Sequence, residues 1–121
     1  MNGKTILIVD DEPEFIEMLQ MRLEANGYTV IAAPDGQAGL DKAQSAKPHL
    51  ILLDVMMPGL DGFETLRKLR RTPDTRGIPV VMMTARSESR AIFKAQDLGA
   101  TDYLIKPCES AELLAVVRKH T

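Results

Sequence analysis

The sequence contains a single cysteine, Cys108, and this scarcity excludes two kinds of small protein scaffold. One cysteine cannot form an internal disulfide bond, so a disulfide-stabilised fold is excluded. Cys108 also has no cysteine or histidine neighbour at the spacing that metal ligands require. A zinc module is therefore excluded as well.

A strong charge of one sign and a long hydrophobic run are also missing. The formal net charge is −2, so no overall positive field would hold nucleic acid or an anionic membrane. No apolar run approaches the roughly 20 residues that a transmembrane helix needs. The first residues lack the apolar stretch and the small-residue cleavage site of a signal peptide. We therefore expect a cytoplasmic protein that binds neither a membrane nor nucleic acid directly.

Internal repeats, low-complexity segments and Pro/Gly/Ser-rich linkers are absent too, so no feature marks a domain boundary. The 121 residues are enough for one hydrophobic core and too few for two ordinary domains. Hydrophobic residues make up 45% and charged residues 26%, the balance of a globular chain rather than a disordered one. We predict one domain over residues 1–121.

What the sequence does contain is an alternation of strand and helix patterns. Short, β-branched apolar runs predict five strands: Thr5–Val9, Tyr28–Ala32, Leu50–Leu53, Ile78–Met83 and Tyr103–Ile105. Stretches of helical length predict five helices: Pro13–Asn26, Gly36–Ala46, Gly62–Arg71, Ser87–Leu98 and Ser110–Lys119. The strands are nearly continuous in apolar residues, as in a parallel sheet covered on both faces. We predict an α/β, flavodoxin-like, doubly wound fold, with a five-stranded parallel sheet in the order 2-1-3-4-5 flanked by five helices.

Polar and charged residues stand at the carboxyl ends of four predicted strands. They are Asp10, Asp11 and Glu12 after the first strand, Asp54 after the third, Thr84 after the fourth and Lys106 after the fifth. In open α/β sheets, ligands bind at these ends where the strand order reverses. For the predicted order, that point lies between the first and third strands. Asp10, Asp11 and Asp54 should therefore converge, with Thr84 and Lys106 on the neighbouring strands.

Three converging carboxylates repel one another unless a cation lies among them. Hard oxygen ligands shared with a phosphoryl group suit Mg²⁺, which keeps several of its waters. A carboxylate that acts as the nucleophile gives an acyl phosphate. Lys106 would supply a positive charge to a phosphoryl oxygen, and Thr84 a hydroxyl donor. The residues thus predict phosphoryl transfer to an aspartate.

Four segments carry a resemblance to a known family. They are Ile6–Glu12 (ILIVDDE), Leu53–Gly59 (LDVMMPG), Met83–Ala85 (MTA) and Asp102–Pro107 (DYLIKP). In this order and spacing they resemble the receiver domain of two-component response regulators, across nearly the whole chain. The resemblance implies a phosphorylatable switch rather than an enzyme acting on other molecules, although the receiver catalyses its own phosphorylation and dephosphorylation.

The resemblance also implies a role for each matching residue. Asp54 would be the phosphoacceptor, and Mg²⁺ would be bound by Asp10, Asp11, Asp54 and the backbone carbonyl of Met56. Lys106 would pair with the phosphoryl group, and Thr84 would donate to it together with the backbone N–H of Ala85. Tyr103 would be the switch aromatic that turns inward as Thr84 moves. The Lys106–Pro107 bond would be a cis peptide.

Partners are implied in the same way. The phosphodonor would be a phosphohistidine on a sensor histidine kinase or a histidine phosphotransfer protein. A downstream protein target or an output domain would read the surface of the fourth helix, fifth strand and fifth helix. Val116 stands where dimerising, DNA-binding regulators usually place an arginine, so we expect a monomer or a weak dimer. The sequence leaves open whether this is a stand-alone receiver or part of a longer regulator.

Three other functions must be weighed against this one. A phosphohydrolase with an aspartyl nucleophile would carry Asp-x-Asp after its first strand, where this chain has adjacent acids. A flavin-binding module would need a phosphate-cradling loop there, and the acids would repel the phosphate. A degenerate receiver used as a docking module is the remaining alternative, and the complete set of site residues argues against it.

Simpler structural roles are open for several of these residues. The acids after the first strand could merely favour a helix start, and Tyr103 could be a packing aromatic. The basic run Arg67–Arg71 lacks an aromatic residue and is interpreted as a solvated helix end rather than a nucleic-acid patch. His49 and His120 have no acidic partner at a useful spacing, so both are interpreted as surface residues.

Overall fold

The computed structural model describes residues 3–55, 57, 61–85 and 98–121. The strands are β1 Thr5–Val9, β2 Thr29–Ala33, β3 Leu50–Asp54, β4 Val80–Ala85 and β5 Asp102–Lys106. The helices are α1 Pro13–Glu24, α2 Gly36–Ala46, α3 Gly62–Arg71 and α5 Ser110–His120. The predicted helix Ser87–Leu98 falls outside the described residues except at its last position, so the prediction of five helices is not tested.

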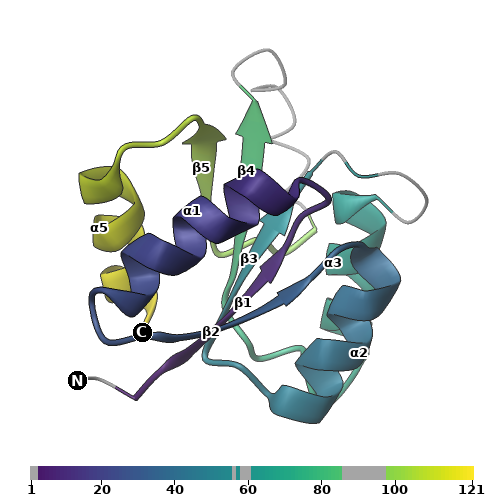
Figure 1. The fold of residues 1–121 in the computed structure, drawn as a ribbon. Coiled ribbons are helices and arrows are strands. Elements are labelled where there is room, and N and C mark those ends of the chain that lie inside the picture. Colours follow the sequence, from purple (N-terminus) through teal and green to yellow (C-terminus); the bar gives the residue numbers. More distant parts are fainter. Residues whose placement is uncertain (1–2, 56, 58–60, 86–97) are drawn as a thin grey trace.

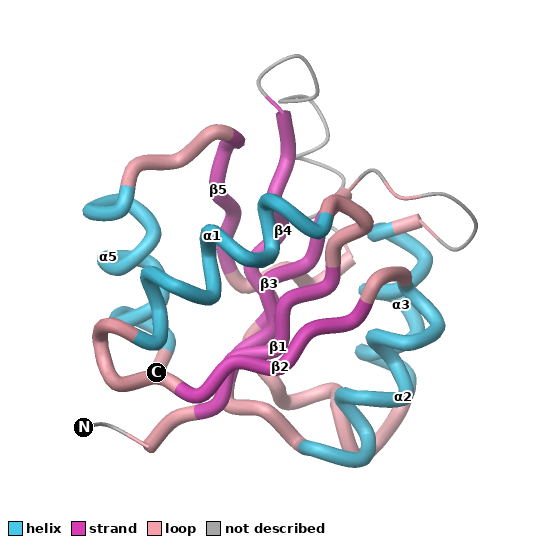
Figure 2. The backbone as a smooth tube through the Cα atoms, viewed as in Figure 1, coloured by secondary structure: helices cyan, strands magenta, loops and turns pink. Residues whose placement is uncertain are grey.

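The strands form one parallel sheet, shown in magenta in Figure 2. Their order is β2-β1-β3-β4-β5, which confirms the predicted order. β1 pairs with β2 on one side and with β3 on the other, so the order reverses between β1 and β3. The carboxyl ends of these two strands therefore meet at the predicted place.

Helices cover both faces of the sheet, with α1 and α5 on one side and α2 and α3 on the other (Figure 1). Successive strand residues point to opposite faces, and in β1 all except the first are buried. Ile6 and Ile8 belong to the hydrophobic cluster that includes residues of α1 and α5. Leu7 and Val9 belong to the cluster that includes residues of α2 and α3. Burial on both faces explains why the strand sequences are continuously apolar.

Some element boundaries differ from the prediction. β4 continues two residues past Met83 because Thr84 and Ala85 pair with Ile105 and Lys106 of β5. β5 is extended to Lys106 by the same pairing. α1 ends two residues before Asn26, where a turn at Gly27, with φ of +88°, leads into β2.

Aspartate side chains define the starts of α2 and α3. Asp35 accepts a hydrogen bond from the Ala38 N–H at 2.8 Å, and Asp61 accepts one from the Glu64 N–H at 2.9 Å. Each bond satisfies a backbone donor that the first helical turn leaves without a partner. Within the described part of the chain, no helix has the length and apolar character needed to cross a membrane.

Candidate functional site

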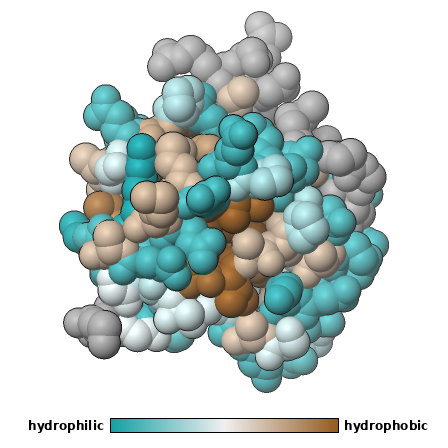
Figure 3. All heavy atoms as spheres, viewed as in Figure 1, coloured by the Kyte–Doolittle hydropathy of each residue, from teal (hydrophilic) through white to brown (hydrophobic). Residues whose placement is uncertain are grey.

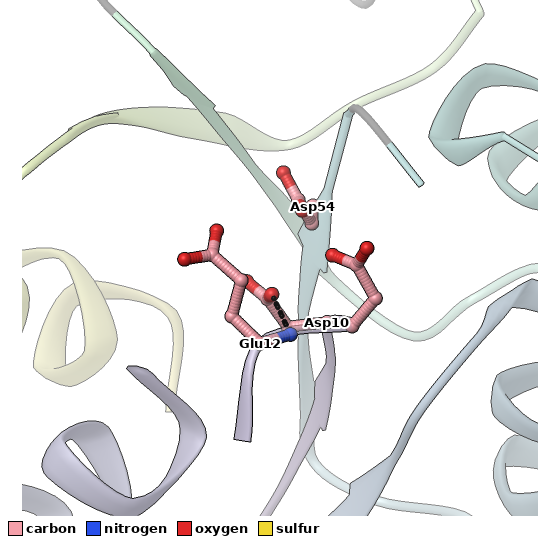
Figure 4. A group of neighbouring side chains, drawn as sticks. Asp10, Glu12 and Asp54 are labelled. Carbon is pink, nitrogen blue, oxygen red and sulfur yellow. Dashed lines mark hydrogen bonds between the residues drawn. The ribbon is translucent and has the colours of Figure 1, made fainter. Parts of the chain in front are cut away.

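The candidate site lies where β1 and β3 end side by side. Val9, the last residue of β1, pairs with Leu53 of β3. Asp10 follows directly, and its N–H donates to the carbonyl of Ala33 at 3.1 Å. Asp54 is the last residue of β3. Parallel pairing therefore places both carboxylates at one edge of the sheet (Figure 4).

Four acidic side chains gather at this edge. Asp10, Asp11, Glu12 and Asp54 each offer a carboxylate oxygen, and these oxygens all lie within 4.8 Å of one another. Asp10 and Asp54 are buried, whereas Asp11 and Glu12 are exposed. The Glu12 N–H donates to Asp10 Oδ1 at 2.9 Å, the dashed line in Figure 4. The convergence of Asp10, Asp11 and Asp54 is thus confirmed as geometry.

Glu12 joins this cluster although the sequence did not predict it as a ligand. Its carboxylate is 66% exposed and lies 3.5 Å from Lys106 Nζ. The available signal was its position directly after Asp10 and Asp11, at the turn into α1. Four carboxylates at one point form a set of hard oxygen donors that fits a divalent cation such as Mg²⁺.

Lys106 brings a positive charge from β5 into the acidic cluster. Its Nζ lies 2.8 Å from Asp10 Oδ2 and 3.5 Å from Asp54 Oδ2. The same nitrogen lies 4.2 Å from the centroid of the Phe15 ring. The Lys106–Pro107 peptide is cis, as the resemblance implied.

The charges around Lys106 affect its pKa in opposite directions. Burial lowers the pKa of the ammonium, while the hydrogen bond to Asp10 and the charges of Asp54, Asp10 and Glu12 raise it. The net result is a pKa above the ordinary lysine value. Lys106 therefore remains charged at neutral pH, as a partner for an anion must.

Thr84 and Ala85 lie at the carboxyl end of β4, next to the end of β3. Asp54 pairs with Met83, and Thr84 follows Met83 along β4. Thr84 is buried, and Ala85 pairs with Lys106. The two residues are thus at the same edge of the sheet as the acidic cluster. Met56, the predicted backbone ligand, lies outside the described residues.

Tyr103 lies deeper along β5, opposite Met82. It is half-buried and packs against the hydrophobic cluster on the α2 and α3 side. It also lines a groove of about 460 Å³ with Ile105 of β5 and Ala115 and Val116 of α5. The Tyr103 side chain therefore contacts both the hydrophobic cluster and a groove that a partner protein could contact.

An apolar groove of about 340 Å³ adjoins the acidic cluster. Ile16 of α1 and Ala32, Ala33 and Pro34 at the end of β2 line it, together with Asp10 and Asp11 of the cluster. In Figure 3, which has the same view as Figure 1, apolar side chains lie in a hollow at the centre of the visible face. The acidic cluster thus opens next to a surface that could contact another molecule.

The interpretation of His120 as a plain surface residue is wrong. Its Nε2 lies 2.9 Å from Asp102 Oδ2, and the side chain is only 15% exposed. The two residues are 18 apart in the sequence, and the sheet and α5 bring them together. His49 is exposed, as expected. The basic run on α3 is exposed except for Leu69 and Arg70.

Comparison with known proteins identifies a family for almost the whole chain. The model of the response regulator receiver domain matches residues 6–118. The alkaline phosphatase synthesis transcriptional regulatory protein PhoP of Bacillus subtilis is 44% identical over 116 residues, which are 96% of this chain and 48% of that protein. The chain thus spans about half the length of the curated relatives it matches.

Solved structures agree with this match. The chemotaxis protein CheY4 of Vibrio cholerae superimposes with a TM-score of 0.92 at 31% identity, covering 98% of this chain and 99% of that one. The receiver domain of the sensor histidine kinase PA1611 of Pseudomonas aeruginosa gives a TM-score of 0.89 at 30% identity, covering 98% and 97%. The latter structure is described with a magnesium ion coordinated in its active-site cleft.

Proposed function

Because this chain belongs to the response regulator receiver domains of two-component systems, we propose that it is a signalling switch phosphorylated on Asp54. The observation that carries this assignment is the position of Lys106 Nζ, 3.5 Å from Asp54 Oδ2 inside a cluster of acidic side chains. An ammonium beside a buried carboxylate is suited to offset the charge that a phosphoryl group would bring. The gathering of these charges at one end of the sheet supports this reaction.

Asp54 is the proposed nucleophile. It is the buried carboxylate at the end of β3, and its Oδ2 lies 3.5 Å from the Lys106 ammonium. An Asp54 oxygen would form the new O–P bond while the P–N bond of a phosphohistidine breaks, and the histidine nitrogen would keep the electron pair. Lys106 would then face one more anionic group and remain its counter-charge.

Asp10, Asp11 and Asp54 are the proposed Mg²⁺ ligands, together with the backbone carbonyl of Met56. Glu12 is a further candidate because its carboxylate lies in the same cluster. When bound, Mg²⁺ would draw negative charge from the phosphoryl oxygens. The negative charge of these carboxylates would attract the cation, and the bound cation would in turn reduce the repulsion among them.

Thr84, Ala85 and Tyr103 are proposed to convert phosphorylation into a change of surface. The Thr84 hydroxyl and the Ala85 N–H would donate to the phosphoryl oxygens. Thr84 pairs with Ile105, two residues after Tyr103. A movement of Thr84 in β4 would therefore displace the neighbouring residues of β5. Tyr103 lines a groove with α5, and its rotation would alter that groove.

The proposed phosphodonor is a sensor histidine kinase or a histidine phosphotransfer protein. The surface covered by a bound protein donor would include the apolar groove beside the acidic cluster. The proposed readout surface comprises residues 87–98, β5 and α5, and it would contact a downstream protein or an output domain. Residues 87–97 of this surface lie outside the described residues.

Several relatives of this chain are transcriptional regulators, and this chain matches about half of each. We infer that the matched domain itself makes no direct contact with nucleic acid or with a membrane. Its net charge of −2 supports this inference. We also propose a cytoplasmic location, because the first residues lack the pattern of a signal peptide. Val116 in α5 stands where dimerising regulators usually place an arginine, so we propose a monomeric or weakly dimeric state.

Intact-mass measurement after incubation with Mg²⁺ and acetyl phosphate tests the proposal. We expect one phosphoryl adduct that requires Mg²⁺ and is absent in Asp54→Ala. Asp41→Ala, which removes an exposed carboxylate of α2, should retain the adduct. If the wild type gains no adduct from acetyl phosphate or from a phosphorylated histidine phosphotransfer protein, the docking-module alternative is correct instead.

A further inference from the structure

Phe15 supplies one wall of the space around the Lys106 ammonium. Lys106 Nζ lies 4.2 Å from the centroid of the Phe15 ring, the range in which an ammonium is attracted to an aromatic face. Phe15 comes from α1 and Lys106 from β5, so the contact joins two elements that are far apart in the sequence. It is the aromatic partner of the charge that faces Asp54.

We propose that Phe15 is a positioning residue for phosphoryl transfer: its ring holds the Lys106 ammonium where Asp54 can use it. This inference rests on the proposed function, because the ammonium needs a fixed position only if a phosphoryl group arrives at Asp54. The ring does not touch the reacting atoms and acts only through Lys106.

The contacts of Lys106 explain why a positioning residue is needed. Among the described acidic residues, only Asp10 lies at hydrogen-bond distance, 2.8 Å, from the ammonium. Its distances to Asp54 and Glu12 are both 3.5 Å, so the two acids compete for it. Glu12 is 66% exposed and could draw the flexible lysine toward solvent. The Phe15 ring attracts the ammonium without occupying any carboxylate.

The ring is also well placed to keep this role when the charges in the site change. Phe15 packs against the hydrophobic cluster between the sheet and α1 and α5. Its position is therefore determined by core packing and not by the acids. When the site gains a cation or a phosphoryl group, we therefore expect the ring to stay in place and still attract the ammonium.

Proton NMR of the protein without Mg²⁺ tests the contact itself. A ring face this close to Nζ should shift the neighbouring Lys106 Cε protons upfield, and the signal can be assigned by its loss in Lys106→Met. We expect the upfield shift to vanish in Phe15→Leu and to persist in Phe15→Tyr. An unchanged Lys106 shift in Phe15→Leu would overturn the inference.

The rate of Asp54 phosphorylation by acetyl phosphate and Mg²⁺ tests the consequence. We expect Phe15→Leu to lower this rate about threefold to tenfold, the equilibrium effect of a contact of this kind, and Phe15→Tyr to restore it. Val30→Ala removes packing from the same hydrophobic cluster through β2 and should leave the rate unchanged. An equal loss of rate in Val30→Ala, or none in Phe15→Leu, would contradict the positioning role.

The two measurements separate this inference from the proposed function. If the wild type shows the upfield shift but is never phosphorylated, the proposed function fails and the positioning role fails with it. If the wild type is phosphorylated and Phe15→Leu reacts equally fast, only the positioning role of Phe15 is wrong.

Discussion

Gly62 lies so close to Asp54 that a Cβ atom added to it would overlap the Asp54 carbonyl oxygen. The same Cβ would lie 2.7 Å from the Cα of Val55. The Gly62 N–H donates to the Val55 carbonyl at 3.0 Å, which holds the two segments together. The first residue of α3 thus packs directly against the backbone of the strand end that carries the phosphoacceptor.

Gly62→Ala should destabilise the protein and disturb the site. Because the overlapping atoms are backbone atoms, they cannot rotate away, and overpacking of this kind typically costs about 1–3 kcal/mol. Urea unfolding should show a lower midpoint, and phosphorylation of Asp54 should slow. Gly77→Ala is the matched control, since a Cβ at Gly77 meets no atom within 4 Å. Equal midpoints for the two variants would contradict the close packing.

Arg70 of α3 connects three segments at the end of the sheet opposite the acidic cluster. Its Nε donates to the Gly99 carbonyl at 2.9 Å, and Nη1 donates to the carbonyls of Ile78 at 2.8 Å and Arg76 at 3.1 Å. Burial lowers the pKa of the Arg70 guanidinium below its ordinary value. A planar group with several fixed donors makes this set of bonds possible.

Arg70→Lys should lower the free energy of unfolding by about 1–3 kcal/mol, because one ammonium cannot reach all these carbonyls. The measurement is chemical denaturation with circular dichroism. Arg71→Lys, at an exposed neighbouring position, should change the stability by less than about 0.5 kcal/mol. If both variants unfold at the same denaturant concentration, the hydrogen bonds of Arg70 make no net contribution to the free energy of unfolding.

The fold was predictable because its signals are local in the sequence. Continuous apolar runs predicted β1 and β3, and the alternation with helical stretches predicted a parallel sheet. The ends of β4 and β5 were not predictable in the same way. Thr84 and Ala85 belong to β4 because they pair with β5, and such pairing is a property of the folded sheet.

The site was predictable to the extent that it follows strand ends. The meeting of Asp10, Asp11 and Asp54 follows from the strand order alone. The contacts of Phe15 and His120 could not be predicted, because each partner comes from an element distant in the sequence.

Asp102 and His120 should contribute stability that depends on pH. Burial alone raises the pKa of Asp102. Hydrogen bonds from His120 and the Tyr103 N–H, with the charges of His120 and Lys119, outweigh burial, so the net pKa is lower than its ordinary value. A carboxylate with a depressed folded pKa stabilises the protein above its unfolded pKa, and this stability is lost as the pH falls through the folded pKa.

Asp102→Asn should therefore be less stable than the wild type at pH 7, by less than about 1 kcal/mol for a partly exposed pair. The difference should begin to shrink as the pH falls below about 4, the ordinary pKa of an aspartate, and disappear only below the lower pKa of Asp102 in the folded protein. Thermal unfolding from pH 3 to 7 measures it. Asp74→Asn, at an exposed position, serves as the control. A difference that persists undiminished at pH 3 would rule out the charge of Asp102 as its cause.

Mg²⁺ should stabilise the folded protein because the acidic cluster exists only when β1 and β3 are paired. A ligand at about 100 times its Kd adds about 2.7 kcal/mol to the free energy of unfolding, so the Tm should rise with Mg²⁺ and fall again with EDTA. Asp11→Asn should lose most of this increase, and Glu12→Gln less, because Glu12 is 66% exposed and also pairs with Lys106. Asp41→Asn should retain it. Equal Mg²⁺-dependent increases in wild type and Asp11→Asn would mean that the cation binds elsewhere. In that case the carboxylates would only balance the charge of Lys106, and the transfer to Asp54 would need another source of positive charge in place of the cation.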